Sequence, residues 1–150
     1  MCGIGGYRAW GEARPSIDML RALLLANEAR GRDAAGVAFL EDNNIVIAKQ
    51  EGTATELVKA FDETYGYWER IQASHTVLIH ARASTKGSEK VNGNNHPVSF
   101  GEWVVVHNGH VVNDDDLFRY YKTQKGEGLA VDTLAIPMVL SQGKTIEDSL

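Results

Sequence analysis

The sequence is poor in cysteine, with one cysteine among 150 residues, and this scarcity excludes several classes of protein. A single cysteine cannot form an internal disulfide, so the chain is not a disulfide-stabilised secreted domain, and a reducing compartment would keep the side chain as a thiol. The histidines have no cysteine partners and no paired-ligand spacing such as HExxH, which argues against a metal site. We therefore expect no metal and no other cofactor. The five histidines are His75, His80, His96, His107 and His110.

Long apolar runs and clustered positive charge are also missing. No stretch approaches the ~20 apolar residues that span a bilayer, and the N-terminus lacks the basic-then-apolar profile of a signal peptide. The formal net charge is -5 and the lysines and arginines are scattered, so the chain offers no basic surface to a nucleic-acid backbone. We expect a cytoplasmic protein that binds neither membranes nor nucleic acids.

A chain of 150 residues is long enough for one domain with a substantial core and too short for two, so residues 1–150 are expected to form a single domain. Apolar residues recur at helical spacing from Ile17 to Ala29, and Ser16 precedes them as an N-cap. Thr53 and Glu56 form a capping-box pattern that predicts a second helix. The other elements expected here are a buried strand over 2–9, a hairpin with strands at 34–40 and 45–50, a helix ending at 61 with a further helical piece up to 70, and a strand over 76–80.

A polar stretch from Arg82 to Phe100 follows these elements. It is too long for a simple connection between two strong strands, so we expect a functional loop. Asn108-Gly109 is a strong two-residue turn signal between apolar runs. The pattern therefore predicts a second hairpin, with strands at 103–107 and 110–112.

The last third of the chain carries three helix-capping signals. Asn113 precedes an acidic first turn, which complements the dipole of a helix that starts at residue 114. Asp132 is positioned to cap a helix over 133–141, in which Pro137 predicts a kink or a shorter helix and Gly143 marks the end. A final capping-box pattern spans 145–148.

The single cysteine directly follows Met1. Because the Cys2 side chain is small, we expect removal of Met1, which leaves a thiol and a free α-amino group on one residue. An α-amino group titrates near ~7.7–8, so close to neutral pH it can take the proton of the thiol directly or through a water. A lone cysteine is more commonly a small buried hydrophobic residue, and its position at residue 2 is what favours a nucleophile.

Six segments of the chain carry motif-like residues: Cys2-Gly3-Ile4-Gly5-Gly6, Arg30 to Ala38, Ile79 to Gly87, Asn94-Asn95-His96-Pro97, Val106 to Gly109, and Val131-Asp132-Thr133. The first resembles the start of the class II glutamine amidotransferases, the cysteine branch of the N-terminal nucleophile (Ntn) hydrolases. The other five resemble, in the same order, the family motifs R-G-x-D-S/A-A-G-I-A, G/I-H-T-R-W-A-T-H-G, N-A-H-P, V-H-N-G and D-T-E. The motif style is nearest to that of the glutaminase domains of glucosamine-6-phosphate synthases.

The resemblance implies an α+β fold, the four-layer αββα sandwich of the Ntn hydrolases. It also implies hydrolysis of the glutamine side-chain amide to glutamate and ammonia through a γ-glutamyl thioester on Cys2. We expect ammonia to pass to a synthase or aminotransferase partner, unless the protein is a free-standing glutaminase. Whether the protein forms a homo-oligomer stays open at this point. The family domain is longer than this chain, so the chain is a compact version, or another chain or a continuation supplies the remaining layer.

The resemblance assigns roles to five further residues. The Asn108 side-chain amide and the Gly109 N–H would form the oxyanion hole. Arg82 would bind the α-carboxylate of glutamine in a loop that includes Thr85, Asp132 would bind the α-ammonium group, and Gly109 would also contact the substrate. The simpler interpretations are a solvated surface charge for Arg82, a hairpin turn for Asn108-Gly109 and a helix cap for Asp132.

Three positions depart from the family motifs: Ala83 replaces tryptophan, Lys86 replaces histidine and Leu134 replaces glutamate. The nucleophile and the oxyanion residues are retained, but the loop that would bind glutamine is changed. Two alternatives therefore stay open. One is an N-terminal-cysteine hydrolase of another γ-glutamyl or acyl amide, and the other is a catalytically silent glutamine-sensing or structural subunit.

Overall fold

A computed structural model describes residues 1–143, which form an α+β fold with two antiparallel sheets. The larger sheet has the order β1-β4-β2-β3, and the smaller sheet pairs β5 with β6. The strands are β1 (Gly3–Arg8), β2 (Ala34–Glu41), β3 (Asn44–Glu51), β4 (Thr76–Arg82), β5 (Val98–Phe100) and β6 (Trp103–Val105).

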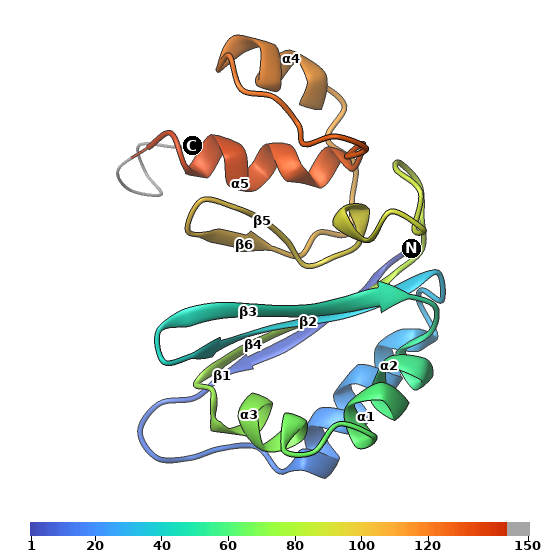
Figure 1. Cartoon of the computed structure of the whole chain (residues 1–150), viewed down its shortest axis with the longest axis vertical. Helices are drawn as coiled ribbons and strands as arrows, with labels where there is room; N and C mark the ends of the chain where they lie inside the picture. Colours follow the sequence, from blue (N-terminus) through green and yellow to red (C-terminus); the bar gives the residue numbers. More distant parts are fainter. Residues whose placement is uncertain (144–150) are drawn as a thin grey trace.

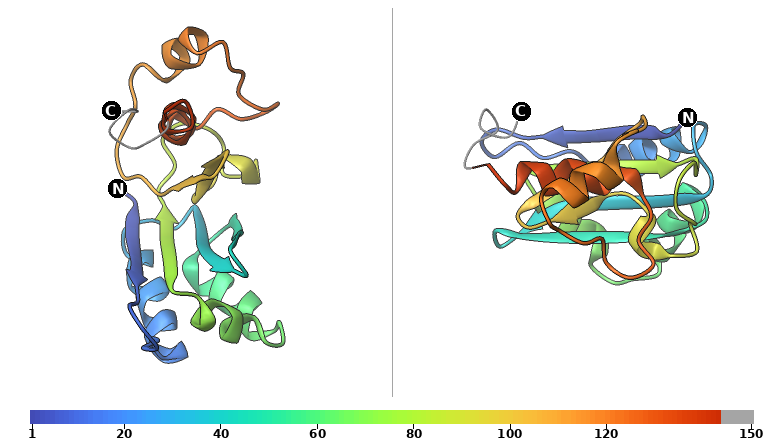
Figure 2. Two further views of the ribbon diagram at one scale, coloured as in Figure 1. Left: turned by 90° about the vertical axis from the view of Figure 1, so that its left-hand side faces the viewer. Right: turned by 90° about the horizontal axis from the view of Figure 1, so that it is seen from above.

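The elements stack in layers (Figure 1). Helices α1 (Ile17–Glu28), α2 (Ala54–Asp62) and α3 (Tyr67–Ala73) cover one face of the larger sheet. The smaller sheet lies over the opposite face, and α5 (Ala135–Leu140) packs on it with α4 (Asp114–Tyr120) beyond (Figure 2). Among residues 1–143, no helix is long and apolar enough to cross a membrane.

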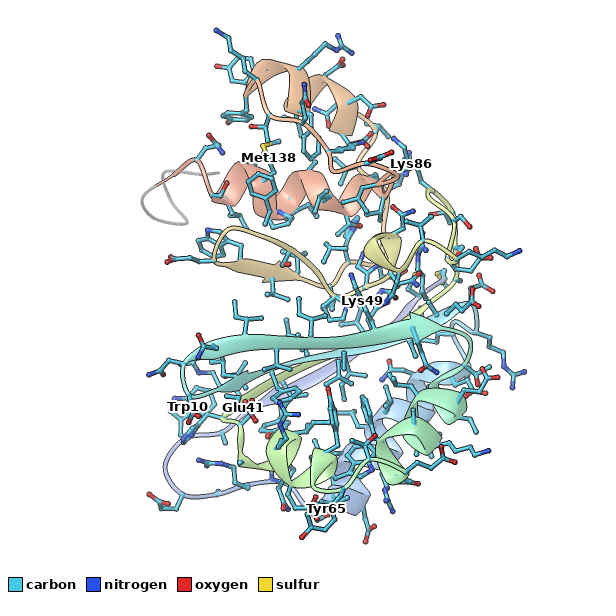
Figure 3. The ribbon with its side chains drawn as sticks, in the orientation of Figure 1. Trp10, Glu41, Lys49, Tyr65, Lys86 and Met138 are labelled. Atoms are coloured by element: carbon cyan, nitrogen blue, oxygen red, sulfur yellow. The ribbon has the colours of Figure 1, made fainter. Side chains whose placement is uncertain are left out.

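Residues 1–143 form two apolar cores, and each lies between a sheet and the helices that cover it. One lies between α1, α2, α3 and the larger sheet, and includes Leu24, Phe39 and Ile79. The other lies between the smaller sheet and helices α4 and α5, and includes Phe118 and Met138 (Figure 3). Each sheet therefore buries one face against helices, while the gap between the two sheets is lined partly by polar side chains.

Both helix starts predicted in the first half are confirmed. The Ser16 hydroxyl accepts a hydrogen bond from the Met19 N–H at 3.1 Å. Thr53 and Glu56 form a complete capping box, in which each side chain accepts a bond from the other residue's backbone N–H. These contacts satisfy N–H groups that have no partner inside the helix.

The predicted hairpin is also confirmed, with each strand extended to 34–41 and 44–51. Its turn residues Asp42 and Asn43 both have left-handed backbone geometry, with φ of 49° and 63°. Such geometry matches the twist of the flanking strands and suits these short polar residues.

The prediction of a buried first strand is wrong. β1 pairs only with β4 and forms an edge of the larger sheet. Its exposure alternates along the strand, and the Ile4 side chain, on the face away from the helices, is 47% exposed. An edge strand beneath a narrower sheet keeps one covered face and one open face.

The prediction of a hairpin at Asn108-Gly109 is wrong as well. The second hairpin turns at Gly101, which has a left-handed φ of 57°, and joins β5 to β6. No strand forms over 110–112, and residues 106–113 are irregular. The Val111 N–H is bonded to the Asp132 carboxylate instead of a neighbouring strand, which explains why the pairing does not form.

The predicted side-chain caps at Asn113 and Asp132 are not made. Asn113 precedes α4 but its side chain makes no capping bond, and Asp132 starts a 3-10 helix (Asp132–Leu134) without capping it. α5 begins only at Ala135, so Pro137 falls in its first turn, where a proline breaks no helical hydrogen bond. The capping-box pattern at 145–148 lies outside the described residues.

Candidate active site

Cys2 lies at the start of β1, beside the end of β4. The Ala83 N–H donates to the Cys2 sulfur at 3.4 Å, and the sulfur lies 3.6 Å from the Ala83 carbonyl oxygen. The Arg30 Nε–H donates to the Cys2 carbonyl at 3.0 Å. Cys2 is half-buried, so its thiol is held in place while part of the residue stays open to solvent.

Asn108 meets Cys2 directly. The Cys2 backbone N–H donates to the Asn108 side-chain oxygen at 3.1 Å. While Met1 is attached, this nitrogen is an amide, and it stands in for the α-amino group that removal of Met1 would create. Because the amide oxygen of Asn108 faces this nitrogen, its NH₂ group is available to donate to another acceptor. Asn108 and the adjacent Gly109 are both exposed.

Long-range contacts hold the segment that carries Asn108. The His80 Nε2 lies 3.1 Å from the His107 carbonyl oxygen, and since a carbonyl only accepts, this nitrogen carries the proton. The His107 ring contacts the Thr133 hydroxyl at 3.2 Å. A Cβ at position 109 would lie 2.6 Å from the His107 ring, so a larger residue there would displace that ring. The segment is therefore anchored to β4 and to the start of the last helical region.

Arg82, the last residue of β4, is not a solvated surface charge. It is only 3% exposed, and burial lowers the pKa of its guanidinium from the ordinary value. The guanidinium donates to the Asn95 side-chain oxygen at 2.8 Å and to the carbonyls of Lys86 and Gly87 at 2.7 Å each. Arg82 thus lies beneath the loop that follows β4 and shapes it, whereas Thr85 is exposed on that loop.

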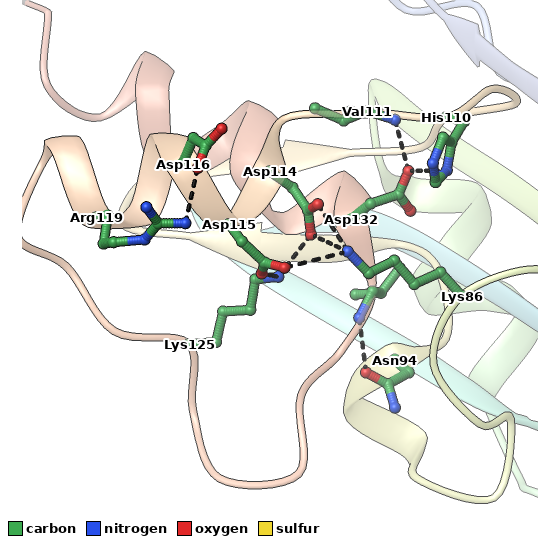
Figure 4. Close-up of polar contacts among 11 residues, drawn as sticks. Lys86, Asn94, His110, Val111, Asp114, Asp115, Asp116, Arg119, Lys125 and Asp132 are labelled. Atoms are coloured by element: carbon green, nitrogen blue, oxygen red, sulfur yellow. Dashed lines mark hydrogen bonds and ion pairs between the residues drawn. The ribbon is translucent and has the colours of Figure 1, made fainter.

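Asp132 joins the segment of Asn108 from the opposite side. The Asp132 side chain is 5% exposed, and its carboxylate accepts from the Val111 N–H at 2.6 Å and lies 3.1 Å from His110 Nδ1 (Figure 4). These contacts differ from those of the helix cap that was predicted. The structure therefore brings Cys2 and Asn108 into contact. Asp132 binds the same segment at Val111, three positions after Asn108 in the chain.

Two buried asparagines, for which no role was predicted, complete this framework. The Asn94 oxygen accepts from the N–H groups of Ala130 and Val131 at 2.8 and 3.1 Å, which fixes the backbone leading to Asp132. Asn95 accepts from Arg82. Two consecutive asparagines in a polar stretch between strong strands were the sequence signal that could have pointed to this role. When such amides are buried they require specific hydrogen-bond partners.

The segment resembling R-G-x-D also has a supporting role that the sequence did not reveal. Arg30 holds the Cys2 carbonyl, and the Asp33 carboxylate accepts from the Ser84 N–H at 2.7 Å. The two ends of this short segment therefore fix Cys2 and the loop next to it. The match to the family motif was the sequence signal for this segment. Its charged side chains position neighbouring backbone groups.

Two buried histidines and the half-buried Lys49 lie between the two sheets. The rings of His80 and His96 stack with centroids 4.2 Å apart, and burial lowers the pKa of His80 to about 4 and that of His96 to about 2. Among the described residues, neither ring nitrogen of His96 has a hydrogen-bond partner. Burial also lowers the pKa of Lys49 to about 8. The Lys49 side chain lies on the side of β3 that faces the smaller sheet (Figure 3), and its ammonium donates to the Asn95 and Pro97 carbonyls. Both histidines are therefore neutral near pH 7.

Residues 1–143 contain no group of three or more histidine, cysteine, aspartate or glutamate side chains arranged to hold a metal ion. The arrangement at Cys2 instead offers a thiol, a nitrogen beside it and a side-chain amide with free donors. This set can support attack on an amide carbonyl and stabilisation of the resulting oxyanion.

No protein-family model matches the chain, but curated relatives do. It is 37% identical over 114 residues to the glutamine–fructose-6-phosphate aminotransferase (isomerizing) of Aquifex aeolicus, a match that covers 75% of the chain and 18% of the relative. The enzyme of the same name from Staphylococcus aureus (strain Mu50) is 33% identical over 122 residues, covering 78% and 18%. That from Streptomyces coelicolor is 34% identical over 134 residues, covering 89% and 20%. The matched part of the chain thus spans about a fifth of the length of these relatives.

Proposed function

The chain belongs to the class II glutamine amidotransferases, and on this basis we propose that it hydrolyses the side-chain amide of glutamine to glutamate and ammonia. The observation that carries the proposal is the 3.1 Å contact between the Cys2 nitrogen and the Asn108 side chain. The contact supports the proposal because it brings together the two residues that would supply a nucleophile, its base and an oxyanion donor. The observed order of helix, sheet, sheet and helix layers supports the further proposal that the fold is the αββα sandwich of the Ntn hydrolases.

The proposed reaction begins once Met1 is removed. The α-amino group takes the thiol proton, and the Cys2 sulfur attacks the amide carbon of glutamine. The negative charge that develops on the amide oxygen is met by the Asn108 NH₂ and the Gly109 N–H. The C–N bond then breaks, ammonia leaves with the proton held by the amine, and a γ-glutamyl thioester remains. Water hydrolyses this thioester and restores the thiol.

We propose that Asp132 binds the α-ammonium group and that Arg82, with Thr85, binds the α-carboxylate. The carboxylate of Asp132 accepts from the Val111 N–H of the segment that carries Asn108, which suits the first role. The Arg82 guanidinium has five N–H donors, and its bonds to Asn95, Lys86 and Gly87 use three of them. The Nε–H and one Nη1–H are the donors through which Arg82 would reach a carboxylate.

The destination of the ammonia is also a proposal. The matched relatives are named aminotransferases, and the matches cover only 18–20% of their length. We propose a cytoplasmic protein whose ammonia is used by a synthase or aminotransferase partner that binds the acceptor outside these 150 residues. A free-standing glutaminase would show instead the same turnover with or without such a partner.

A second candidate is a hydrolase of another γ-glutamyl or acyl amide. It is favoured by Ala83, which stands where the family motif has tryptophan, in the loop beside the Cys2 sulfur. The smaller side chain would change the shape of the space next to the thiol. Lys86, the other changed position in that loop, pairs with Asp114.

A glutaminase assay separates these functions. The protein is prepared with Cys2 at its N-terminus and a C-terminal tag, and the control carries an extension ahead of Cys2. We expect glutamate release from the first protein alone. Turnover of a different γ-glutamyl amide without glutaminase activity would favour the second candidate, and the absence of both activities would indicate a silent subunit.

A further inference from the structure

Two lysines meet the buried carboxylate of Asp114 at the start of α4 (Figure 4). The Lys86 ammonium lies 2.7 Å from both oxygens of Asp114, and the Lys125 ammonium lies 2.6 Å from one of them. Lys125 also contacts Asp115 at 2.7 Å. Asp114 is only 2% exposed, so this is an interior charge with two partners.

The electrostatics show that the pairing is tight. Burial raises the pKa of Asp114, but the bonds to Lys125 and Lys86 outweigh it and lower that pKa below the ordinary value. A carboxylate in this setting requires its cations, since an unpaired charge in the interior is strongly unfavourable. Each lysine therefore has a defined position.

The two lysines come from different parts of the fold. Lys125 belongs to the segment after α4, so its contact with Asp114 closes a link within one layer. Lys86 belongs to the loop that follows β4 in the larger sheet, and its contact with Asp114 joins that sheet to the outer helical layer. Among residues 1–143, the ion pairs of Lys86 with Asp114 and, at 3.8 Å, with Asp115 tie the loop after β4 to α4.

The loop that Lys86 ties down is the one that faces Cys2. The Arg82 guanidinium bonds the carbonyls of Lys86 and Gly87, and the Ala83 N–H bonds the Cys2 sulfur. At the other end, Asp114 directly follows the irregular segment of residues 106–113 that carries Asn108. The Lys86–Asp114 ion pair therefore connects the loop of Arg82 to the segment of Asn108.

We propose that Lys86 is a positioning residue, which latches residues 83–87 against the start of α4 and thereby sets the affinity for the substrate carboxylate. The proposal rests on the glutaminase function for the affinity, whereas the latch itself can be measured without activity. It also gives Lys86, where the family motif has histidine, a structural partner of its own in this chain. Arg82 then owes its position to two constraints, its bonds to the loop carbonyls and the latch on that loop.

The first experiment compares Lys86→Met with Lys125→Met. Both substitutions remove a cation from the same carboxylate and keep an unbranched side chain, but only the first frees the loop. For Lys86→Met we expect the KM for glutamine to rise about tenfold, the size of one lost charge-assisted hydrogen bond, with kcat within about twofold. Lys125→Met should leave KM unchanged. Lys86→Arg should restore the normal KM because it keeps the cation.

The second experiment measures amide hydrogen exchange in residues 83–91, which requires no substrate. We expect faster exchange there in Lys86→Met and unchanged exchange in Lys125→Met. If Lys86→Met folds poorly, the double variant Lys86→Met/Asp114→Asn removes the buried carboxylate that has lost one of its two cations, and it should show the same loop exchange.

The outcomes separate the latch from the proposed function. Fast loop exchange in Lys86→Met without glutaminase activity in the unmodified protein would refute the proposed function and leave the latch intact. Unchanged loop exchange in Lys86→Met, or an equal increase in Lys125→Met, would overturn the latch. A normal KM in Lys86→Met despite fast exchange would overturn its role in substrate affinity.

Discussion

The backbone nitrogen of Cys2 lies 3.1 Å from the side-chain oxygen of Asn108, although 106 positions separate the two residues in the chain. The contact fixes the orientation of the Asn108 amide, with its oxygen toward the N-terminus. Its NH₂ group is then free to donate to an oxyanion. The relationship therefore links the base of the proposed reaction to the group that stabilises its intermediate.

Substitution of Asn108 tests this double role. Asn108→Ala should lower kcat by about 10²–10³ and leave KM little changed, because the amide meets the oxygen only as charge develops. Asn108→Asp keeps an oxygen for the Cys2 nitrogen but loses the donor, so it should lose kcat similarly while the protein stays folded. Steady-state kinetics with circular dichroism checks both, and near-normal kcat in folded Asn108→Ala would remove the oxyanion role.

Asp132→Asn separates substrate binding from structure. An asparagine oxygen can still accept from the Val111 N–H, but the negative charge that would attract the α-ammonium group is lost. We expect the KM for glutamine to rise at least about tenfold with kcat little changed. Glutaramate, which is glutamine without the amine, is the control substrate, and its KM should not change. An equal effect on both substrates would show that Asp132 acts only through the fold.

Arg82→Lys provides the corresponding test for the α-carboxylate. A lysine ammonium cannot replace a planar fork that binds Asn95, two loop carbonyls and a substrate at once, so KM should rise more than kcat falls. Steady-state kinetics over a wide range of glutamine concentrations measures this split. If KM for glutamine is unchanged in the Arg82 and Asp132 variants but turnover of a different amide is altered, the alternative hydrolase function is favoured.

Because two histidines are buried, we expect the free energy of unfolding to fall in acid. The pKa of His80 is lowered to about 4 and that of His96 to about 2, whereas an unfolded histidine titrates near ~6.5. Below about pH 6.5 the unfolded chain binds protons that the folded chain does not, so the free energy of unfolding falls with falling pH. Each histidine contributes a slope of about 1.4 kcal/mol per pH unit through the window from about pH 6 to about pH 4.

His96→Phe is the matched variant for this prediction. Phenylalanine keeps an aromatic ring against His80, and neither His96 nitrogen has a hydrogen-bond partner among the described residues to lose. Urea denaturation at several pH values should therefore show a flatter acid slope for His96→Phe, by about the contribution of one histidine. An identical slope in both proteins would mean that His96 does not titrate as a buried neutral ring.

Local sequence signals predicted the parts of the fold that depend on neighbouring residues. Ser16 and Thr53 cap their helices through residues three positions away, and Asp42-Asn43 forms its turn through its own backbone preferences. Asn108-Gly109 carries an equally strong local signal, yet no hairpin forms there. The bonds of His80 to His107 and of Asp132 to Val111 hold the segment in a different conformation.

The candidate site shows the same division. The family motifs named Cys2, Asn108 and Asp132, but spacing alone could not reveal that the first two touch. The ion pair of Lys86 with Asp114 joins residues 28 positions apart and depends on the packing of the two layers. Contacts of this kind follow from tertiary structure, which local sequence signals do not specify.

The most direct measurement of the central claim is the site of reaction with 6-diazo-5-oxo-norleucine, a glutamine-like electrophile. Peptide mapping by mass spectrometry after incubation should show one adduct, on a peptide that begins with Cys2 and lacks Met1. Cys2→Ser should take up no label and lose most of its activity, because a hydroxyl is a far poorer nucleophile than a thiol. Label on any other residue, or retained Met1 in fully active protein, would contradict Cys2 as an N-terminal nucleophile.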